Sequence, residues 1–157
     1  MKIQIITIGK KHDKNLEDFI KDFEKRIKAH FDLEWTILNS IDDNNKEVQI
    51  RKESEKIFET LEKVGKNSFV ILLDENGKEK GTKDLASLFQ EKMNEGIEKI
   101  IFIIGGAFGV SEDIFKKSDF VLSLSKLVFP HQLVRVILIE QIYRCVSILK
   151  NGKYHHE

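Results

Sequence analysis

Two wholly apolar runs constrain the fold of this chain more than any other feature. They are Phe69 to Leu73 (FVILL) and Lys99 to Ile104 (KIIFII), and a helical pattern from Thr82 to about Asn94 separates them. Continuous apolar strands are typical of parallel sheets, because helices cover both faces of such a sheet and bury both faces of each strand. A strand, a helix and a second buried strand therefore predict a parallel crossover.

The rest of the chain continues the alternation of strands and helices. Short apolar runs predict further strands at 3–8, 33–38 and 120–123. Apolar residues at helical spacing predict helices over 16–27, 48–64 and 131–149. The candidate caps are Asn15 for the first of these helices, Thr82 for the helix between the two apolar runs, and Ser111 for a further short helix. The polar run 74–78 predicts a turn. We expect one α/β domain over residues 1–157, with a mainly parallel sheet and helices on both of its faces.

Charge limits the possible partners without deciding them. The chain has 26 Lys and Arg and 26 Asp and Glu, and a net charge of zero argues against a strongly basic nucleic-acid binder. The charges are unevenly spread, because residues 116–157 carry +4 and residues 1–115 carry −4. This asymmetry permits an anionic partner, although ordinary scatter explains it equally well.

Several classes of protein and site are not expected. The apolar runs are far shorter than the roughly 20 residues of a membrane helix, and the opening residues show no signal-peptide cleavage site. The lone Cys145 cannot form an internal disulfide, so the expected compartment is the cytoplasm. His131, His155, His156 and Cys145 lack metal-ligand spacing, and no metal site is predicted.

Ligands of open α/β sheets bind beyond the carboxyl ends of the strands, which nominates the loops after Leu73, Ile104 and Ser123. The second loop is Gly105-Gly106-Ala107-Phe108-Gly109, whose glycines let the backbone approach a ligand closely. It matches neither a dinucleotide nor a nucleoside-triphosphate motif, and a plain strand-to-helix turn explains it equally well. The run from Ser123 to Pro130 combines hydroxyls with apolar side chains, which suits either a ligand wall or a buried connection.

The last predicted helix carries Arg135, Glu140 and Arg144 among apolar residues. Glu140 and Arg144 have the i,i+4 spacing of an exposed ion pair, which is the ordinary explanation for such residues. The alternative is that the two arginines grip phosphate groups, which guanidinium groups can do with two parallel hydrogen bonds.

Taken together, several motifs closely resemble the bacterial ribosomal RNA large subunit methyltransferase H family, a group of short SPOUT proteins. The resemblance covers the whole chain from its MKIQIITIGK start. The motifs that carry it are Gly105-Gly106-Ala-Phe-Gly109, Ser123-Leu-Ser125-Lys, Phe129-Pro130-His131-Gln-Leu-Val-Arg135, Glu140-Gln141-Ile-Tyr143-Arg144 and Tyr154-His155.

The resemblance implies a fold with a C-terminal trefoil knot, S-adenosyl-L-methionine as methyl donor and no metal. It implies methylation of N3 of a pseudouridine in the 23S rRNA of the assembled 70S ribosome, with S-adenosyl-L-homocysteine as the other product. It also implies a homodimer in which the tail of one subunit approaches the active site of the other. The implied cofactor positions are Leu73, Gly105, Gly106, Ser125, Lys126, Leu127, Val128, Phe129 and Pro130.

The resemblance and general chemistry assign four residues to the RNA. N3 of a uracil ring carries a weakly acidic proton that must leave, so His155 is the expected base and Arg144 the expected stabiliser of the anion. Tyr154 would stack on the target base, and Arg135 would help to place phosphate or base. Another SPOUT RNA methyltransferase, acting on tRNA or on ribose, and a non-catalytic ribosome-associated module remain as alternatives.

Overall fold

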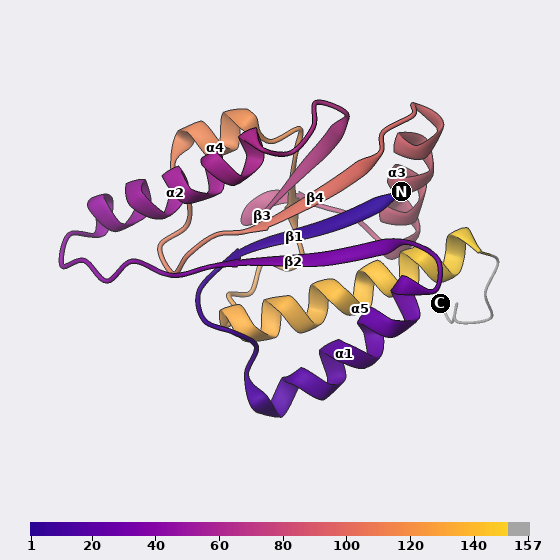
Figure 1. The fold of residues 1–157 in the computed structure, drawn as a ribbon, viewed down its shortest axis with the longest axis horizontal. Helices are drawn as coiled ribbons and strands as arrows, with labels where there is room; N and C mark the ends of the chain where they lie inside the picture. Colours follow the sequence, from indigo (N-terminus) through magenta and orange to yellow (C-terminus); the bar gives the residue numbers. More distant parts are fainter. Residues whose placement is uncertain (151–157) are drawn as a thin grey trace.

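The computed structural model describes residues 1–150 and contains one five-stranded sheet with the strand order β2-β1-β4-β3-β5. All four strand pairs are parallel, which confirms the predicted parallel α/β architecture (Figure 1). The strands are β1 Lys2–Ile8, β2 Asp32–Leu38, β3 Ser68–Glu79, β4 Lys99–Ile104 and β5 Phe120–Ser123. The helices are α1 Lys14–Lys28, α2 Lys46–Glu62, α3 Thr82–Asn94, α4 Glu112–Lys117 and α5 His131–Leu149.

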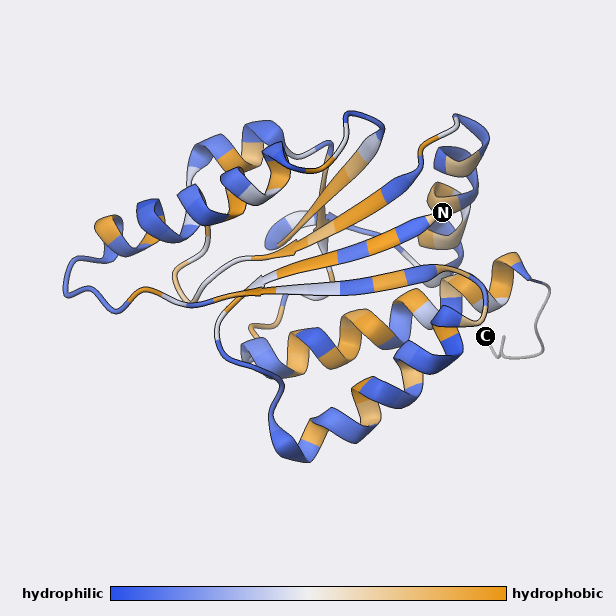
Figure 2. Cartoon of the chain, viewed as in Figure 1, coloured by the Kyte–Doolittle hydropathy of each residue, from blue (hydrophilic) through white to orange (hydrophobic). Residues whose placement is uncertain are grey.

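Two apolar layers hold the helices against the sheet. On β4, Ile100, Phe102 and Ile104 join the core shared with α1, α3 and α5, whereas Ile101 and Ile103 join the core shared with α2 and α4. Figure 2 shows the apolar residues concentrated on the strands and on the sides of the helices that face them. Each such buried side chain contributes about 1.5–3 kcal/mol relative to exposure, which explains why the apolar runs determine the architecture.

The α5 helix lies between α1 and α3. Tyr143 of α5 packs edge-on against Phe23 of α1, with 5.4 Å between the ring centroids. On the other side, the Thr82 hydroxyl of α3 donates a hydrogen bond of 2.8 Å to the Gln141 side chain. The helix is therefore fixed from two sides, and its first residue is held near the ends of the central strands.

Two of the predicted caps are wrong by one or two residues. The α1 helix begins at Lys14, and its cap is Asp13, whose carboxylate accepts from the Asn15 backbone N–H at 2.8 Å. Thr82 is the first residue of α3 rather than its cap, because its hydroxyl is engaged with Gln141. The candidate cap Ser111 does precede α4, although its side chain makes no capping hydrogen bond.

The predicted turn at 74–78 is also wrong, because β3 continues to Glu79. Its pairing with β5 shifts register between Leu73 and Lys78, so the intervening residues bulge out of the ladder. Gly77 permits this path, since a Cβ there would lie 2.8 Å from backbone atoms of Val121 and Leu122. The bulge places residues 74–76 beside the end of β4.

Among residues 1–150, no helix is long and apolar enough to cross a membrane.

Candidate active site

A cavity of about 490 Å³ lies beyond the carboxyl end of β4 and beside the bulged part of β3. The register pairs Leu73 with Ile104, so the bulge after Leu73 and the glycine loop after Ile104 begin side by side. The segment after β5 and the first turn of α5 close the remaining side. The lining residues are 73–76, 104–110, 124, 125, 127–129, 131 and 134, together with Lys46.

The glycine loop forms the floor of this cavity, and at each of its three glycines a side chain is disfavoured by close contacts or by the backbone conformation. A Cβ on Gly105 would lie 2.7 Å from the Val110 side chain, and a Cβ on Gly106 would lie 2.0 Å from a Glu53 carboxylate oxygen. Gly109 has a φ of +85°, and its N–H donates to the Gly106 carbonyl at 3.0 Å. These contacts exclude larger side chains and leave backbone exposed toward the cavity.

The segment from Ser125 to Pro130 forms a wall with a fixed start and an exposed middle. The Ser123 hydroxyl donates to the Ser125 carbonyl at 3.0 Å, and the Ser125 hydroxyl accepts from the Leu127 N–H at 2.9 Å. Leu127 and Val128 are 70% and 80% exposed, which is unusual for apolar side chains. Phe129 also lines the cavity. Of the described residues in this segment, Lys126 and Pro130 do not line it.

The bulged end of β3 brings an acidic edge that was predicted only as a turn. Asp74, Glu75 and Asn76 line the cavity, and the Asp74 carboxylate accepts from the Asn76 N–H at 2.9 Å. Lys46 reaches the cavity from the start of α2. The position of residues 74–76 directly after a buried strand was a usable signal, whereas nothing in the sequence around Lys46 indicated a role at the site.

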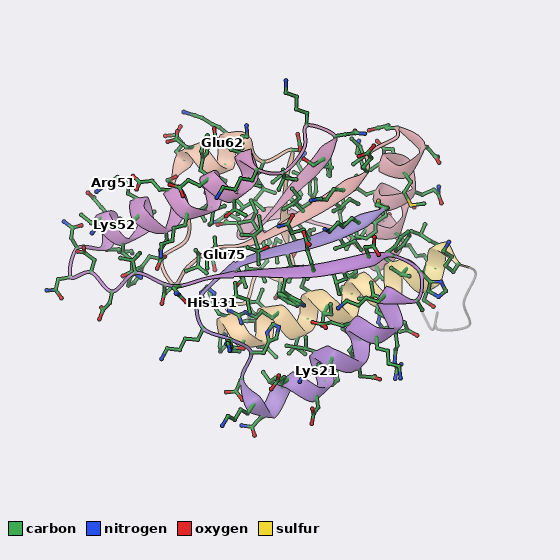
Figure 3. The ribbon with its side chains drawn as sticks, viewed as in Figure 1. Lys21, Arg51, Lys52, Glu62, Glu75 and His131 are labelled. Atoms are coloured by element: carbon green, nitrogen blue, oxygen red, sulfur yellow. The ribbon has the colours of Figure 1, made fainter. Side chains whose placement is uncertain are left out.

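His131, the first residue of α5, lines the cavity but was assigned no role from the sequence. Figure 3 labels His131 and Glu75, which line the same cavity from α5 and β3. Burial lowers the pKa of His131, and the Arg135 guanidinium lowers it further, while the Glu53 carboxylate and the Gly106 backbone act in the opposite direction. The imidazole is therefore held largely neutral near pH 7. Its Nδ1 is buried and has no hydrogen-bond partner among residues 1–150.

Arg135 lies behind the cavity wall rather than in the cavity. Its side chain is fully buried, and Nη1 donates to the Lys10 carbonyl at 2.8 Å and lies 3.4 Å from His12 Nδ1. Within the described part of the chain, its Nε and Nη2 atoms have no hydrogen-bond partner. Burial lowers the pKa of this guanidinium. In this arrangement Arg135 contacts the β1–α1 loop, and an RNA strand outside the protein does not reach it.

Arg144 lies elsewhere on α5. Its guanidinium forms the predicted i,i+4 ion pair with Glu140, whose second oxygen accepts from the Gln141 amide at 2.6 Å. Nine residue steps along the helix lead from Arg135 to Arg144, which is about 13 Å along the axis and two and a half turns. They therefore project from opposite sides of α5. Tyr154 and His155 lie outside the described residues.

The arrangement suits a ligand with both flat apolar and charged parts. Apolar walls from the 124–129 segment face an acidic edge, and the floor offers backbone groups. Pockets of about 300–1,000 Å³ with this mixture are typical of small-molecule and cofactor sites. Among residues 1–150, no three His, Cys, Asp or Glu side chains gather closely enough to hold a metal ion.

Comparison with known proteins supports the resemblance seen in the motifs. A family model described as "Predicted SPOUT methyltransferase" matches residues 1–155. The chain is 40% identical to the ribosomal RNA large subunit methyltransferase H of Christiangramia forsetii, covering 99% of each chain. It is 42% identical to the protein of the same name from Flavobacterium psychrophilum, over 100% of each chain. The corresponding Fusobacterium nucleatum protein is 41% identical over 99% of each chain. This chain therefore belongs to the ribosomal RNA large subunit methyltransferase H family of SPOUT methyltransferases.

Proposed function

We propose that this chain transfers a methyl group from S-adenosyl-L-methionine to N3 of a pseudouridine in the 23S rRNA of the assembled ribosome. The observation that carries the proposal is the composition of the cavity. Leu73, the glycine loop and the segment after Ser125 come from three separate parts of the sequence and line one space. Relatives named for large-subunit rRNA methylation match the chain from end to end. The proposed place of action is the cytoplasm, where assembled ribosomes are found.

The residues of the cavity fit this methyl donor. S-adenosyl-L-methionine supplies a methyl group on a positively charged sulfur and leaves as S-adenosyl-L-homocysteine. The backbone at Gly105 and Gly106 allows close approach, and Leu127 and Phe129 offer apolar surface for a flat base. The carboxylates of Asp74 and Glu75 favour a cationic ligand by simple charge attraction.

The chemical contribution of the protein is alignment, exclusion of water and removal of one proton. Methyl transfer requires the acceptor nitrogen to lie in line with the donor carbon, so the cavity walls must hold both partners. We propose that His155 removes the N3 proton and that Arg144 stabilises the resulting anion, both at the cavity of a second copy, because Arg144 does not line the cavity of its own chain. Glu140 holds the Arg144 guanidinium in place. Tyr154 is proposed to stack on a base that has left the RNA stack.

Arg135 is proposed to act through the loop that it holds. Its bond to the Lys10 carbonyl and the bonds of Gln132 to Asp13 and Lys11 tie residues 10–13 to the start of α5. Lys10 and Lys11 are exposed and positively charged. The fixed loop would present these two charges to RNA phosphates, which supply most of the affinity of such complexes.

The C-terminal trefoil knot and the homodimer also belong to the proposal. The 124–130 segment leads from the edge strand β5 to α5, which lies between α1 and α3, and the proposed knot would use this path. The exposed apolar side chains Leu127, Val128 and Phe108 beside the cavity offer a surface for a second copy. Light scattering of the purified protein measures the dimer, and a monomeric mass contradicts it.

Methylation with a labelled donor tests the activity. We expect transfer to 70S ribosomes from cells that lack the gene, no transfer to isolated tRNA, and one additional methyl on a pseudouridine in mass spectra of the 23S rRNA. Transfer to tRNA would assign the chain to another SPOUT activity. Binding of the donor without transfer to any RNA would indicate a non-catalytic module.

Cross-complementation tests the shared active site. A Gly106→Ala subunit lacks a usable pocket, and a His155→Ala subunit lacks the proposed base. We expect each variant alone to be inactive and their mixed dimer to recover methylation from one of its two sites. A mixture as inactive as its components, with mixed dimers present by mass spectrometry, contradicts sharing between subunits.

A further inference from the structure

Glu53 is a buried carboxylate of α2 that no step of the proposed reaction uses. Its side chain is only 2% exposed, whereas Glu55 and Glu59 of the same helix are exposed. One oxygen, Oε1, accepts from the Ile41 N–H at 2.9 Å and from the Gln49 amide at 3.2 Å. The other oxygen, Oε2, is buried without a hydrogen-bond partner among residues 1–150. A buried carboxylate is costly, so its retention needs a reason.

The unpartnered oxygen lies directly against the floor of the cavity. A Cβ built on Gly106 would lie 2.0 Å from Glu53 Oε2 and 3.0 Å from its carboxyl carbon. The carboxylate thus occupies the space that a side chain at position 106 would need. It contacts the glycine loop from behind, since Gly106 lines the cavity and Glu53 does not.

The next residue of α2 holds the other end of the same loop. The Ser54 hydroxyl accepts a hydrogen bond of 2.9 Å from the Ser111 N–H, and Ser54 is also buried. Two consecutive residues of one helix therefore contact the loop at Gly106 and at Ser111. The position of the cavity floor depends on this single turn of α2.

His131 completes the cluster from α5. Its buried Nδ1 has no hydrogen-bond partner in the described part of the chain, and neither has Glu53 Oε2. The negative charge of Glu53 and a hydrogen bond with the Gly106 backbone both raise the pKa of the imidazole, so the ring lies close to the carboxylate and to the glycine loop. A carboxylate oxygen only accepts and an imidazole nitrogen can donate, so the two unpartnered atoms are chemically complementary.

We propose that Glu53 is a positioning residue that holds the glycine loop and His131 in the arrangement required for cofactor binding. Its free oxygen is the acceptor for His131 or for a loop N–H once the cavity is filled, while Oε1 remains bound to Ile41. This inference rests on the proposed S-adenosyl-L-methionine site. It assigns to the buried face of α2 a part in the pocket beyond that of Lys46, the residue of this helix that lines the cavity.

Glu53→Gln separates this role from simple support of the fold. Glutamine keeps the size of the side chain and an oxygen for the Ile41 N–H, but it removes the charge and replaces the free acceptor with an amide donor. We expect a melting temperature close to that of the wild type and a Kd for S-adenosyl-L-methionine about tenfold higher by calorimetry. In ribosome methylation, KM for the donor should rise while kcat changes little. The matched control is Glu55→Gln, an exposed position on the same helix.

Hydrogen exchange in the cofactor-free protein provides a second measurement. The amides of residues 105–111 should exchange faster in Glu53→Gln than in the wild type, and Glu55→Gln should leave them unchanged. If the wild type does not bind S-adenosyl-L-methionine, the proposed cofactor is wrong, and the exchange rates still decide the role of Glu53. Wild-type exchange and wild-type donor affinity in Glu53→Gln would overturn the inference.

A double-mutant cycle tests the contact itself. Gly106→Ala should weaken donor binding by at least about tenfold in the wild type, because its methyl group meets the carboxylate. In a Glu53→Ala background the same change should cost less than about threefold. An equal loss in both backgrounds shows that the carboxylate is not the obstacle. If Glu53→Ala does not fold, the cycle is run with Glu53→Asp, which withdraws the carboxylate by one methylene.

Discussion

The Arg135 guanidinium is buried, and no carboxylate among residues 1–150 forms an ion pair with it. Within the same residues, its one hydrogen bond shorter than 3 Å goes to the Lys10 carbonyl. Replacing a buried charge by an apolar side chain of similar length is often neutral or stabilising. We therefore expect Arg135→Met to keep or raise the free energy of unfolding in urea. The amides of residues 10–13 should nevertheless exchange faster, because the bond to Lys10 is lost.

A loss of about 3–5 kcal/mol in Arg135→Met, the usual result of breaking a buried ion pair, would contradict this view. Arg26→Met is a suitable control, since Arg26 forms an ion pair with Asp22 on the surface of α1. Its effect on stability should be within about 1 kcal/mol.

Cys145 illustrates how burial suppresses reactivity. The side chain is fully buried in the core, and burial raises the pKa of its thiol to about 12. Because the thiolate is the reactive form, we expect no alkylation by iodoacetamide at pH 8 in the folded protein. Mass spectrometry should detect full alkylation after denaturation in urea. Rapid labelling of the native protein would show that α5 opens locally.

At the scale of single elements, Gly77 determines how β3 passes β5. A methyl group at this position would lie 2.8 Å from the backbone of Val121 and Leu122, which cannot move without breaking strand pairing. We expect Gly77→Ala to lower the free energy of unfolding by about 1–3 kcal/mol, the range for overpacked sites. Gly65→Ala is the matched control, because no atom lies within 4 Å of a Cβ there. Equal effects of the two variants in urea denaturation would contradict the steric explanation.

The elements themselves were largely predictable because local patterns determine them. The runs FVILL and KIIFII became β3 and β4, and the predicted last helix has the observed bounds His131–Leu149. The errors arose where distant residues decide the outcome. Thr82 is not a cap because Gln141, far along the chain, takes its hydroxyl. The extension of β3 depends on pairing with β5, which no local signal around residues 74–79 reveals.

For the candidate site too, local patterns predicted some residues, whereas others depend on contacts between distant parts of the chain. The tendency of ligands to bind beyond the carboxyl ends of parallel strands nominated the segments after Leu73, Ile104 and Ser123, and residues of all three segments line the cavity. Glu53 was not found, because its position on α2 is meaningful only once Gly106 is known to lie against it. Similarly, the sequence does not show that Arg135 points inward while Arg144 remains partly exposed. The place of Glu53 and the orientations of the two arginines depend on tertiary contacts, which the periodicity of the sequence does not encode.

At the scale of the whole molecule, two histidines connect stability to pH. Burial, followed by the charge of Arg135, lowers the pKa of both His12 and His131 below the ordinary value of 6.5. The unfolded chain therefore binds protons at a higher pH than the folded protein does. The sign follows from linkage: stability is fully present above about pH 6.5 and is lost as the pH falls through the lower folded values. The urea midpoint should decrease between pH 7 and pH 5.5.

The double variant His12→Asn, His131→Asn should lose less stability over the same interval, because the two groups responsible are absent. His30 is exposed and serves as the control position, and His30→Asn should follow the wild-type profile. A wild-type midpoint that stays constant or rises on acidification would contradict the lowered pKa values of these two histidines.

The length of α5 limits which active site the tail can serve. The helix runs from His131 at the cavity to Leu149, and 18 steps of 1.5 Å place these ends about 27 Å apart. Six residue steps lead from Leu149 to His155, and even a fully extended chain of that length spans only about 20 Å. Reaching the cavity of its own chain would therefore require nearly this whole span to be directed back along α5. If His155 instead serves the cavity of a second copy, as proposed, dilution below the dimer dissociation constant should abolish methylation without unfolding the protein.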